Sequence, residues 1–337
     1  DRHQLLQIGL KGFEPQLEQR PPANLVFLVD VSGSMQSPDK LGLVKKSLRL
    51  LVNRMDARDR IALAVYAGAA GTVLESTAGS DKASILSAIE SLEAGGSTHG
   101  SAGIELAYAL AEQYRIDDGI NRVIIASDGD MNVGTVNIEA LKDLVERKRQ
   151  AGIALTTLGY GTGNYNYALM EQLADVGNGN AAYIDTLKEA QKVLVNEMQS
   201  TLHTIASVVK IQVEFNSALV SEYRLIGYEN RMLRREDFSN DKVDAGDIGA
   251  GHTVTALYEI VLAGSGGERV PALRYATGRK PSTAGESELA FVKLRYKQPG
   301  ETTSSEVGRP ILRKELSTSL DNCSDDLRFA ASVAGFG

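Results

Sequence analysis

The chain has 337 residues, a length that indicates two domains. Hydrophobic residues make up 43% and charged residues 23%, which excludes a disordered, collagen-like or coiled-coil chain. The net charge of −7 argues against a nucleic-acid partner, and a single cysteine excludes an internal disulfide or a Cys-x-x-Cys zinc site.

Between residues 22 and 206, short apolar runs alternate with patterns of helical spacing. This alternation predicts parallel strands joined by helices, and so a doubly wound α/β domain with a mostly parallel sheet. Ser37, Pro38 and Asp39 are typical of a first helical turn, so we expect the first helix to begin there. The expected strands are 24–30, 60–66, 72–75, 122–127, 153–158 and 181–184, and the expected helices are 38–55, 81–93, 101–115, 138–150, 167–176 and 187–206.

From residue 207 to about 320 the hydrophobic period changes to two. Alternation in 210–215, 253–260 and 289–296 predicts half-exposed antiparallel strands, and so a second, all-β, sandwich-like domain. Polar connections are expected at 239–251, 264–287 and 298–308. The N-terminal segment 1–21 also alternates, and we expect it to join the β domain.

The chain ends, over 321–337, in the start of a helical pattern. It begins with Asp1 rather than Met, and it contains neither a signal peptide nor an apolar run of the roughly 18 residues that cross a bilayer. We therefore expect any membrane attachment to depend on a missing N-terminal anchor.

Oxygen-bearing side chains follow the predicted strands of the α/β domain. Asp30, Ser32 and Ser34 come directly after the first strand, Thr98 precedes a helix, and Asp128 follows the fourth strand. In an open α/β sheet, ligands bind at the carboxyl ends of the strands, where these loops meet. Hydroxyl and carboxylate oxygens at this edge predict a site for a hard cation. We expect its residues to face solvent, so that replacing one costs within about 0.5 kcal/mol of stability.

This pattern resembles the metal-ion-dependent adhesion site of von Willebrand factor type A domains, in which Asp-x-Ser-x-Ser is joined by a distant Thr and a distant Asp. The resemblance implies that Ser32, Ser34 and often Thr98 bind the ion directly, and that Asp30 and Asp128 act mainly through bound waters and hydrogen bonds. The ion would be Mg²⁺ or Mn²⁺ rather than Ca²⁺. An Asp or Glu of a protein partner would fill its open position, and the partner would contact a rim that includes Met35, His99, Asp130, Tyr160 and Asn164.

Several longer stretches of the sequence resemble a bacterial branch of this family, made up of surface proteins and lipoproteins with a C-terminal domain of unknown function. The stretches that carry this likeness are 20–35 (RPPANLVFLVDVSGSM), 158–166 (LGYGTGNYN), 244–260 and 324–330. This resemblance implies an extracytoplasmic place in the cell envelope.

Two other functions stay open on the sequence alone. A phosphatase of the haloacid dehalogenase type would use Asp30 as nucleophile, but it needs a second acid two residues later, where this chain has Ser32. A structural envelope protein would use the metal only to stabilise its fold. Neither reading requires a nucleic acid, and the oligomeric state is not predicted.

Overall fold

The computed structural model divides the chain into two compact units. One is built from 14–203 and 249–251, and the other from 1–13, 204–248 and 252–337. Within the described part of the chain, no helix is both long and apolar enough to cross a bilayer. The described residues are 2–13, 21–96, 100–129, 138–161, 167–196, 204–227, 232–241, 243, 246–270, 287–298, 301 and 303–336.

The first unit is organised around a six-stranded sheet with the order β4-β3-β2-β5-β6-β7. Its pairs are parallel except at one edge, where β4 runs antiparallel to β3. The central strand β2 is buried at every position, because helices cover both faces of the sheet, and this explains its continuous apolar sequence. The strands are β2 (Ala23–Asp30), β3 (Arg60–Tyr66), β4 (Ala70–Ala78), β5 (Ile120–Ser127), β6 (Ile153–Tyr160) and β7 (Ala181–Ile184).

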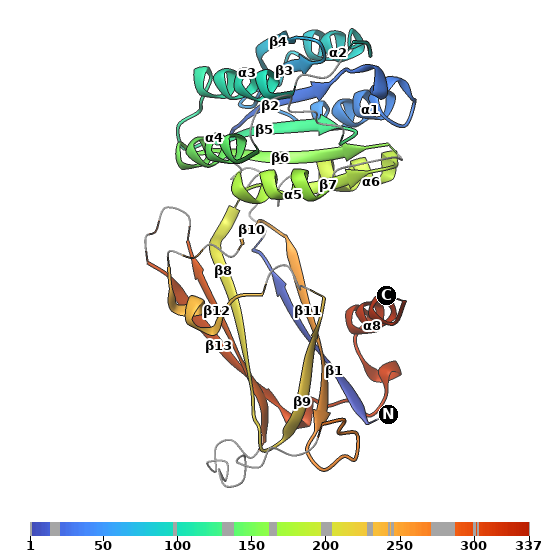
Figure 1. The fold of residues 1–337 in the computed structure, drawn as a ribbon, viewed down its shortest axis with the longest axis vertical. Helices are drawn as coiled ribbons and strands as arrows, with labels where there is room; N and C mark the ends of the chain where they lie inside the picture. The colour runs from blue at the N-terminus through green and yellow to red at the C-terminus, as the bar shows by residue number, and fades with distance from the viewer. Residues whose placement is uncertain are drawn as a thin grey trace. The chain divides into compact units, whose positions relative to one another are not determined.

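Helices pack on both faces of this sheet and give two separate cores (Figure 1). Leu25 and Phe27 of β2 face the core that includes α1, α2 and α6, whereas Val26 and Leu28 face the core that includes α3, α4 and α5. The helices are α1 (Leu41–Val52), α2 (Lys82–Glu90), α3 (Gly100–Gln113), α4 (Ile138–Gln150), α5 (Tyr167–Val176) and α6 (Leu187–Gln191). The predicted doubly wound α/β fold is confirmed.

Several helix boundaries differ from the prediction, most of them by one to three residues, and two of the differences matter for the site and for the domain border. The first helix begins at Leu41 and not at Pro38, because 37–40 forms turns in which the backbone N–H of Lys40 donates to the carbonyl of Ser37. The last helix of this unit ends in a π-helical turn, Lys192–Asn196, and 204–206 already belongs to a strand, so a helix reaching 206 was wrong. The segment 197–203 lies outside the described residues.

The second unit consists of two antiparallel sheets, with the orders β1-β11-β9 and β10-β8-β12-β13. The N-terminal strand β1 pairs with β11 along its whole length, from His3 opposite Val261 to Lys11 opposite Thr253. Part of the connection predicted at 298–308 is strand, because β13 begins at Ser305, and β9 was not predicted. The elements are β1 (His3–Lys11), β8 (Thr204–Phe215), β9 (Val220–Ile226), β10 (Ile248–Gly249), β11 (Thr253–Leu262), β12 (Glu288–Lys297), β13 (Ser305–Leu312) and α8 (Asp325–Phe336).

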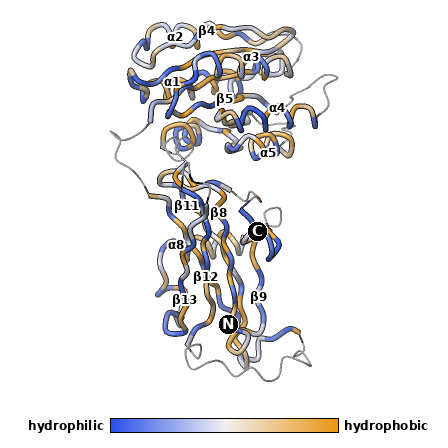
Figure 2. Tube along the Cα trace, turned by 90° about the vertical axis from the view of Figure 1, so that its left-hand side faces the viewer, coloured by the Kyte–Doolittle hydropathy of each residue, from blue (hydrophilic) through white to orange (hydrophobic). Residues whose placement is uncertain are grey.

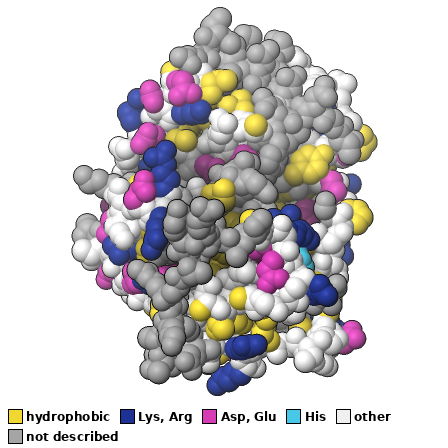
Figure 3. Space-filling model, turned by 60° about the horizontal axis from the view of Figure 1, so that its bottom comes forward, with side chains coloured by type: hydrophobic (Ala, Val, Ile, Leu, Met, Phe, Trp, Pro, Cys, Tyr) yellow, Lys and Arg dark blue, Asp and Glu magenta, His cyan; other side chains and the backbone are white. Residues whose placement is uncertain are grey.

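The two sheets share apolar cores, as in a sandwich. Ile8 of β1 and Ala256 of β11 pack with Val292 of β12, which joins one sheet to the other. Hydrophobic and hydrophilic residues are interleaved along these strands (Figure 2). On the face drawn in Figure 3, acidic and basic side chains are interspersed instead of gathered by sign.

Candidate metal site at the ends of the central strands

The candidate site lies where the direction of strand winding reverses. The chain passes from β2 to β3 on one side, and β5 then lies against the other side of β2. The carboxyl ends of β2 and β5 therefore flank the crevice in which ligands of doubly wound sheets bind. Asp30 ends β2, and Asp128 follows β5 directly.

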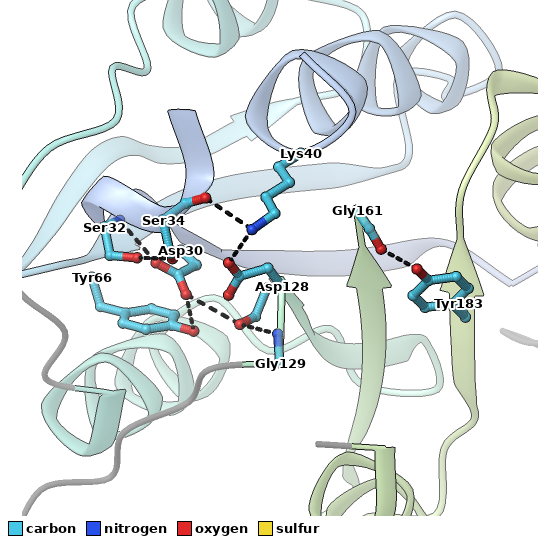
Figure 4. Close-up of polar contacts among 10 residues, drawn as sticks. Asp30, Ser32, Ser34, Lys40, Tyr66, Asp128, Gly129, Gly161 and Tyr183 are labelled. Carbon is cyan, nitrogen blue, oxygen red and sulfur yellow. Dashed lines mark hydrogen bonds and ion pairs between the residues drawn. The ribbon is translucent and has the colours of Figure 1, made fainter. Parts of the chain in front are cut away.

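Asp30 is held by three hydrogen bonds from three different segments (Figure 4). Its Oδ1 accepts from the backbone N–H of Ser32 at 2.8 Å, and its Oδ2 accepts from Tyr66 Oη and Ser127 Oγ, each at 3.1 Å. Asp30 is 0% exposed and Ser32 is 3% exposed, so the expectation that the site faces solvent was wrong for these two residues, whereas Ser34 is exposed as expected. Asp30 is buried because it ends a central strand, where it accepts hydrogen bonds from the ends of the two neighbouring strands.

Burial raises the pKa of the Asp30 carboxyl above its usual value. Hydrogen bonds from Ser32 and Ser127 oppose this rise, and the negative charge of Asp128 adds to it. The neighbouring Tyr66 is fully buried, and burial together with the charge of Asp30 raises the pKa of its hydroxyl. Tyr66 therefore remains a hydrogen-bond donor to the carboxylate at neutral pH.

The hydroxyl groups of Ser32 and Ser34 lie 2.9 Å apart on the turn after β2. An octahedral Mg²⁺ with ligands at about 2.0–2.1 Å has neighbouring ligand oxygens about 2.9 Å apart. The two hydroxyls thus already have the spacing of adjacent ligands of one such ion. The donor set also suits a hard cation, since it consists of hydroxyl and carboxylate oxygens.

Asp128 lies beside this turn, and its side chain is 5% exposed. Its Oδ2 accepts from Lys40 Nζ at 2.8 Å, and the same ammonium group donates to the carbonyl of Ser34 at 3.0 Å. Ser127 next to it accepts from the backbone N–H of Gly129 at 3.1 Å, which orients its hydroxyl toward Asp30. The loops after β2 and β5 are thereby joined through side chains (Figure 4).

The segment that leads to Thr98 is bonded to the same turn through its backbone. Gly95 N–H donates to the carbonyl of Val31 at 2.7 Å, and Gly33 N–H donates to the carbonyl of Gly96 at 3.2 Å. The expected ligand Thr98 follows two residues later, but it lies outside the described residues. The described part of the chain thus brings the third loop to the edge of the site.

Within the described residues, no three His, Cys, Asp or Glu side chains gather in a way that could hold a metal. The structure brings together Asp30, Ser32, Ser34 and Asp128 as expected.

The predicted partner-binding rim needs correction at two positions. Met35 is 0% exposed and packs in the core beside α1, and Tyr160 is 1% exposed at the end of β6. Neither can contact a partner, since hydrophobic packing takes each side chain inward. The remaining rim residues, His99, Asp130 and Asn164, lie outside the described residues.

Three residues of this site were missed in the sequence. Tyr66 and Ser127 end strands next to β2, so their position at a strand end was a usable signal. Lys40 carried no such signal, because it precedes a helix and resembles an ordinary surface lysine. Only the fold of the turn at 37–40 brings its ammonium group to Asp128.

Two family models match the chain in succession. Residues 24–197 match the model described as "von Willebrand factor type A domain", and residues 200–337 match the model described as "Uncharacterized protein YfbK, C-terminal". The two matches meet near the border between the two structural units.

Relatives are found in bacteria and in animals. The chain is 47% identical to "Uncharacterized protein YfbK" of Escherichia coli (strain K12) over all of its length, which is 58% of that protein. It is 26% identical to the human inter-alpha-trypsin inhibitor heavy chain H3 over 264 residues, covering 74% of this chain and 29% of that one. The chain thus spans less than two thirds of these relatives.

A solved structure, von Willebrand factor type A from Catenulispora acidiphila, matches with a TM-score of 0.53 at 14% identity. The match covers 91% of this chain and 69% of that chain, and at this identity it shows a common fold.

Proposed function

Because the chain belongs to the von Willebrand factor type A family, whose members are generally non-catalytic protein-interaction modules, we propose that it binds a protein partner through a divalent cation. The observation that carries the proposal is the arrangement of Ser32 and Ser34 beside Asp30 and Asp128, with the two hydroxyls at the spacing of adjacent Mg²⁺ ligands.

We assign a role to each residue of the site. Ser32 and Ser34 supply ligand oxygens together with Thr98, and Asp30 holds the turn that carries the serines through the N–H of Ser32. Asp30 and Asp128 supply negative charge at the site. The bound cation provides an open coordination position, which a carboxylate of the partner fills.

Mg²⁺ is the ion that this donor set suits best, with Mn²⁺ as the alternative. Ca²⁺ takes six to eight oxygen ligands and favours several direct carboxylates, whereas this site offers mainly hydroxyls. A site with few direct negative ligands also leaves the ion electrophilic toward a partner's Asp or Glu.

The cation is tested by calorimetric titration of the whole chain with Mg²⁺. We expect Ser32→Ala to weaken Mg²⁺ binding at least tenfold, because a direct ligand is lost. The matched control is Ser91→Ala, since Ser91 is an exposed serine at the end of α2 whose hydroxyl donates only to a nearby backbone carbonyl. The proposal fails if the parent chain binds no Mg²⁺ or if the two variants bind it equally.

The partner is tested by capture from a lysate of the native organism with Mg²⁺ or with EDTA. Capture that depends on Mg²⁺ and is lost in Ser32→Ala supports a protein-binding site. Capture that persists in EDTA means that the metal only stabilises the fold, which is the structural alternative.

A phosphatase reaction at Asp30 has less support. Both carboxylate oxygens accept hydrogen bonds from Ser32, Tyr66 and Ser127, and the side chain is fully buried. If the chain hydrolyses a model phosphoester and Asp30→Asn abolishes this activity, the phosphatase hypothesis would be supported.

We also propose a place outside the cytoplasm, in the bacterial envelope, on the resemblance to bacterial surface proteins. Fractionation of native cells checks it, and recovery of the protein in the cytoplasmic fraction would contradict it.

A further inference from the structure

Lys40 lies inside the candidate metal site and belongs to no part of the metal-binding motif. It occupies the position just before α1, where its ammonium group donates both to Asp128 Oδ2 and to the carbonyl of Ser34. The Lys40 side chain is 19% exposed, so most of it is withdrawn from water. Lys40 thus binds one carboxylate of the site and the backbone that carries one of its hydroxyls (Figure 4).

The stem of Lys40 packs against the backbone directly after β6. Gly161, directly after β6, has a φ of +84°, and a Cβ built on it would lie 2.5 Å from Lys40 Cγ. Only glycine allows the lysine stem to pass this close to the backbone. The ammonium group is therefore positioned by contacts with the loops after β2, β5 and β6, and is not a freely moving surface charge.

The net charge of the site shows how the ammonium group of Lys40 affects the binding of a cation. With Asp30 and Asp128 ionised, these two side chains and Lys40 sum to −1, and a bound Mg²⁺ brings the sum to +1. Without Lys40 the same sums are −2 and 0. Removing the lysine therefore increases the attraction for Mg²⁺ but leaves the loaded site without excess positive charge, and Coulomb interactions are strong where water is largely excluded.

We propose that Lys40 is a specificity-determining residue that competes with the cation for Asp128 and, once the cation is bound, strengthens the attraction of the site for a partner's carboxylate. This rests on the proposed metal-dependent function. The lysine lowers the affinity for Mg²⁺ and raises the affinity of the loaded site for an anion, so that the site favours the ternary contact over tight metal storage.

The test compares Lys40→Met and Lys40→Gln with Lys45→Met in the full chain. Lys45 lies on α1, the helix that Lys40 precedes, and donates to the backbone carbonyl of Glu90 in an exposed position, so Lys45→Met removes the same charge away from the site. Calorimetric titration with Mg²⁺ alone should show about tenfold or tighter binding for both Lys40 variants, and binding within about twofold of the parent for Lys45→Met. Lys40→Gln keeps a donor for the carbonyl of Ser34 if Lys40→Met fails to fold.

Two further readouts separate competition from mere positioning. In EDTA, the melting temperature of Lys40→Met should be lower than that of Lys45→Met, because the buried carboxylate of Asp128 has lost the ammonium group of Lys40. Saturating Mg²⁺ should reduce this difference in melting temperature. An NMR titration with acetate, used as the carboxylate probe on the Mg²⁺-saturated proteins, should show several-fold weaker binding to both Lys40 variants.

The possible outcomes are distinct. If the parent binds Mg²⁺ and the Lys40 variants bind it equally or more weakly, Lys40 only positions Asp128 and this inference is overturned while the proposed function stands. If neither the parent nor any variant binds Mg²⁺, the proposed function fails and this inference fails with it. Unchanged acetate binding in the Lys40 variants overturns the role toward the partner's carboxylate.

Discussion

Asp30 combines complete burial with a raised pKa, and both follow from its place at the end of the central strand. A carboxyl whose pKa is higher in the folded than in the unfolded state stabilises the fold below its unfolded pKa. This contribution is lost as the pH rises through the folded pKa. At neutral pH the ionised Asp30 therefore costs stability, which is consistent with a residue retained for binding.

Asp30→Asn removes this charge and keeps the size of the side chain. We expect the variant to lose Mg²⁺ binding. In EDTA at pH 7 it should melt at the same temperature as the parent or higher, because a neutral amide avoids the free-energy cost of burying a charge. Thermal melts with EDTA and with Mg²⁺ measure both effects. A large drop in melting temperature in EDTA would show that the carboxylate stabilises the fold, against this account.

The raised pKa of Asp30 also sets a pH dependence for the metal. A protonated carboxyl contributes no charge to the site, so Mg²⁺ affinity should fall as the pH is lowered from 7, beginning above the ordinary aspartate value of 3.8. Dissociation constants measured by titration at a series of pH values between 7 and 4 test this. An affinity that stays constant over this whole range would contradict the role given to Asp30.

At the scale of elements, α3 begins at Gly100, two residues after the expected ligand Thr98 in the chain. A Cβ built on Gly103 of this helix would lie 2.9 Å from Tyr66 Cβ and 3.1 Å from Leu28 Cδ1, so the helix lies very close to the sheet here. Tyr66 is also one of the three residues that donate hydrogen bonds to Asp30. Close packing of α3 and the hydrogen bonding of the site are therefore coupled through one side chain.

Gly103→Ala should separate α3 from the sheet. We expect a loss of about 1–3 kcal/mol in the free energy of unfolding, as for other overpacked cores, and weaker Mg²⁺ binding because Tyr66 and the loop before α3 move. Denaturant unfolding and Mg²⁺ titration measure the two effects.

Gly42→Ala on α1 provides the control, since a Cβ built there would meet nothing within 4 Å apart from its chain neighbours and the backbone of its own helix. Alanine is the better helix former, so this variant should keep or gain up to about 1 kcal/mol of stability and bind Mg²⁺ as the parent does. Equal behaviour of the two glycine variants would refute the proposed role of α3 packing.

At the scale of the whole molecule, the two units have separate apolar cores, and the candidate site lies within only one of them. A ligand that binds one folded unit raises the melting temperature of that unit. At a concentration 100 times its dissociation constant, it adds about 2.7 kcal/mol to the free energy of unfolding. The second unit includes β1, from the start of the chain, which pairs with β11.

Calorimetric melting of the full chain should therefore show two transitions, of which Mg²⁺ raises one. Ile8→Ala, which opens a cavity between the two sheets of the β unit, should lower the other transition and leave the Mg²⁺ response unchanged. A single transition that shifts with both Mg²⁺ and Ile8→Ala would mean that the units unfold together.

Much of the fold could be read from the sequence, because hydrophobic period is a local property. The continuous run at 24–30 predicted β2, and the alternation at 253–260 predicted β11. The spacing of Asp30, Ser32 and Ser34 likewise predicted a cation turn, since residues two apart on one turn can converge without help from the rest of the chain.

Tertiary structure decided what depends on distant segments. Local signals at 37–39 predicted a helix start, yet the chain makes turns there and α1 begins at Leu41, which brings Lys40 to Asp128. The hydrogen bonds of Tyr66 and Ser127 to Asp30 follow from the order in which strands pair, and Met35 is buried by packing in the core that includes α1. Sequence alone could establish which oxygens are available to a cation. The burial of Asp30, Ser32 and Asp128, and the position of the Lys40 ammonium group beside them, were decided by the packing of strands and loops far apart in the chain, because desolvation and charge act through space.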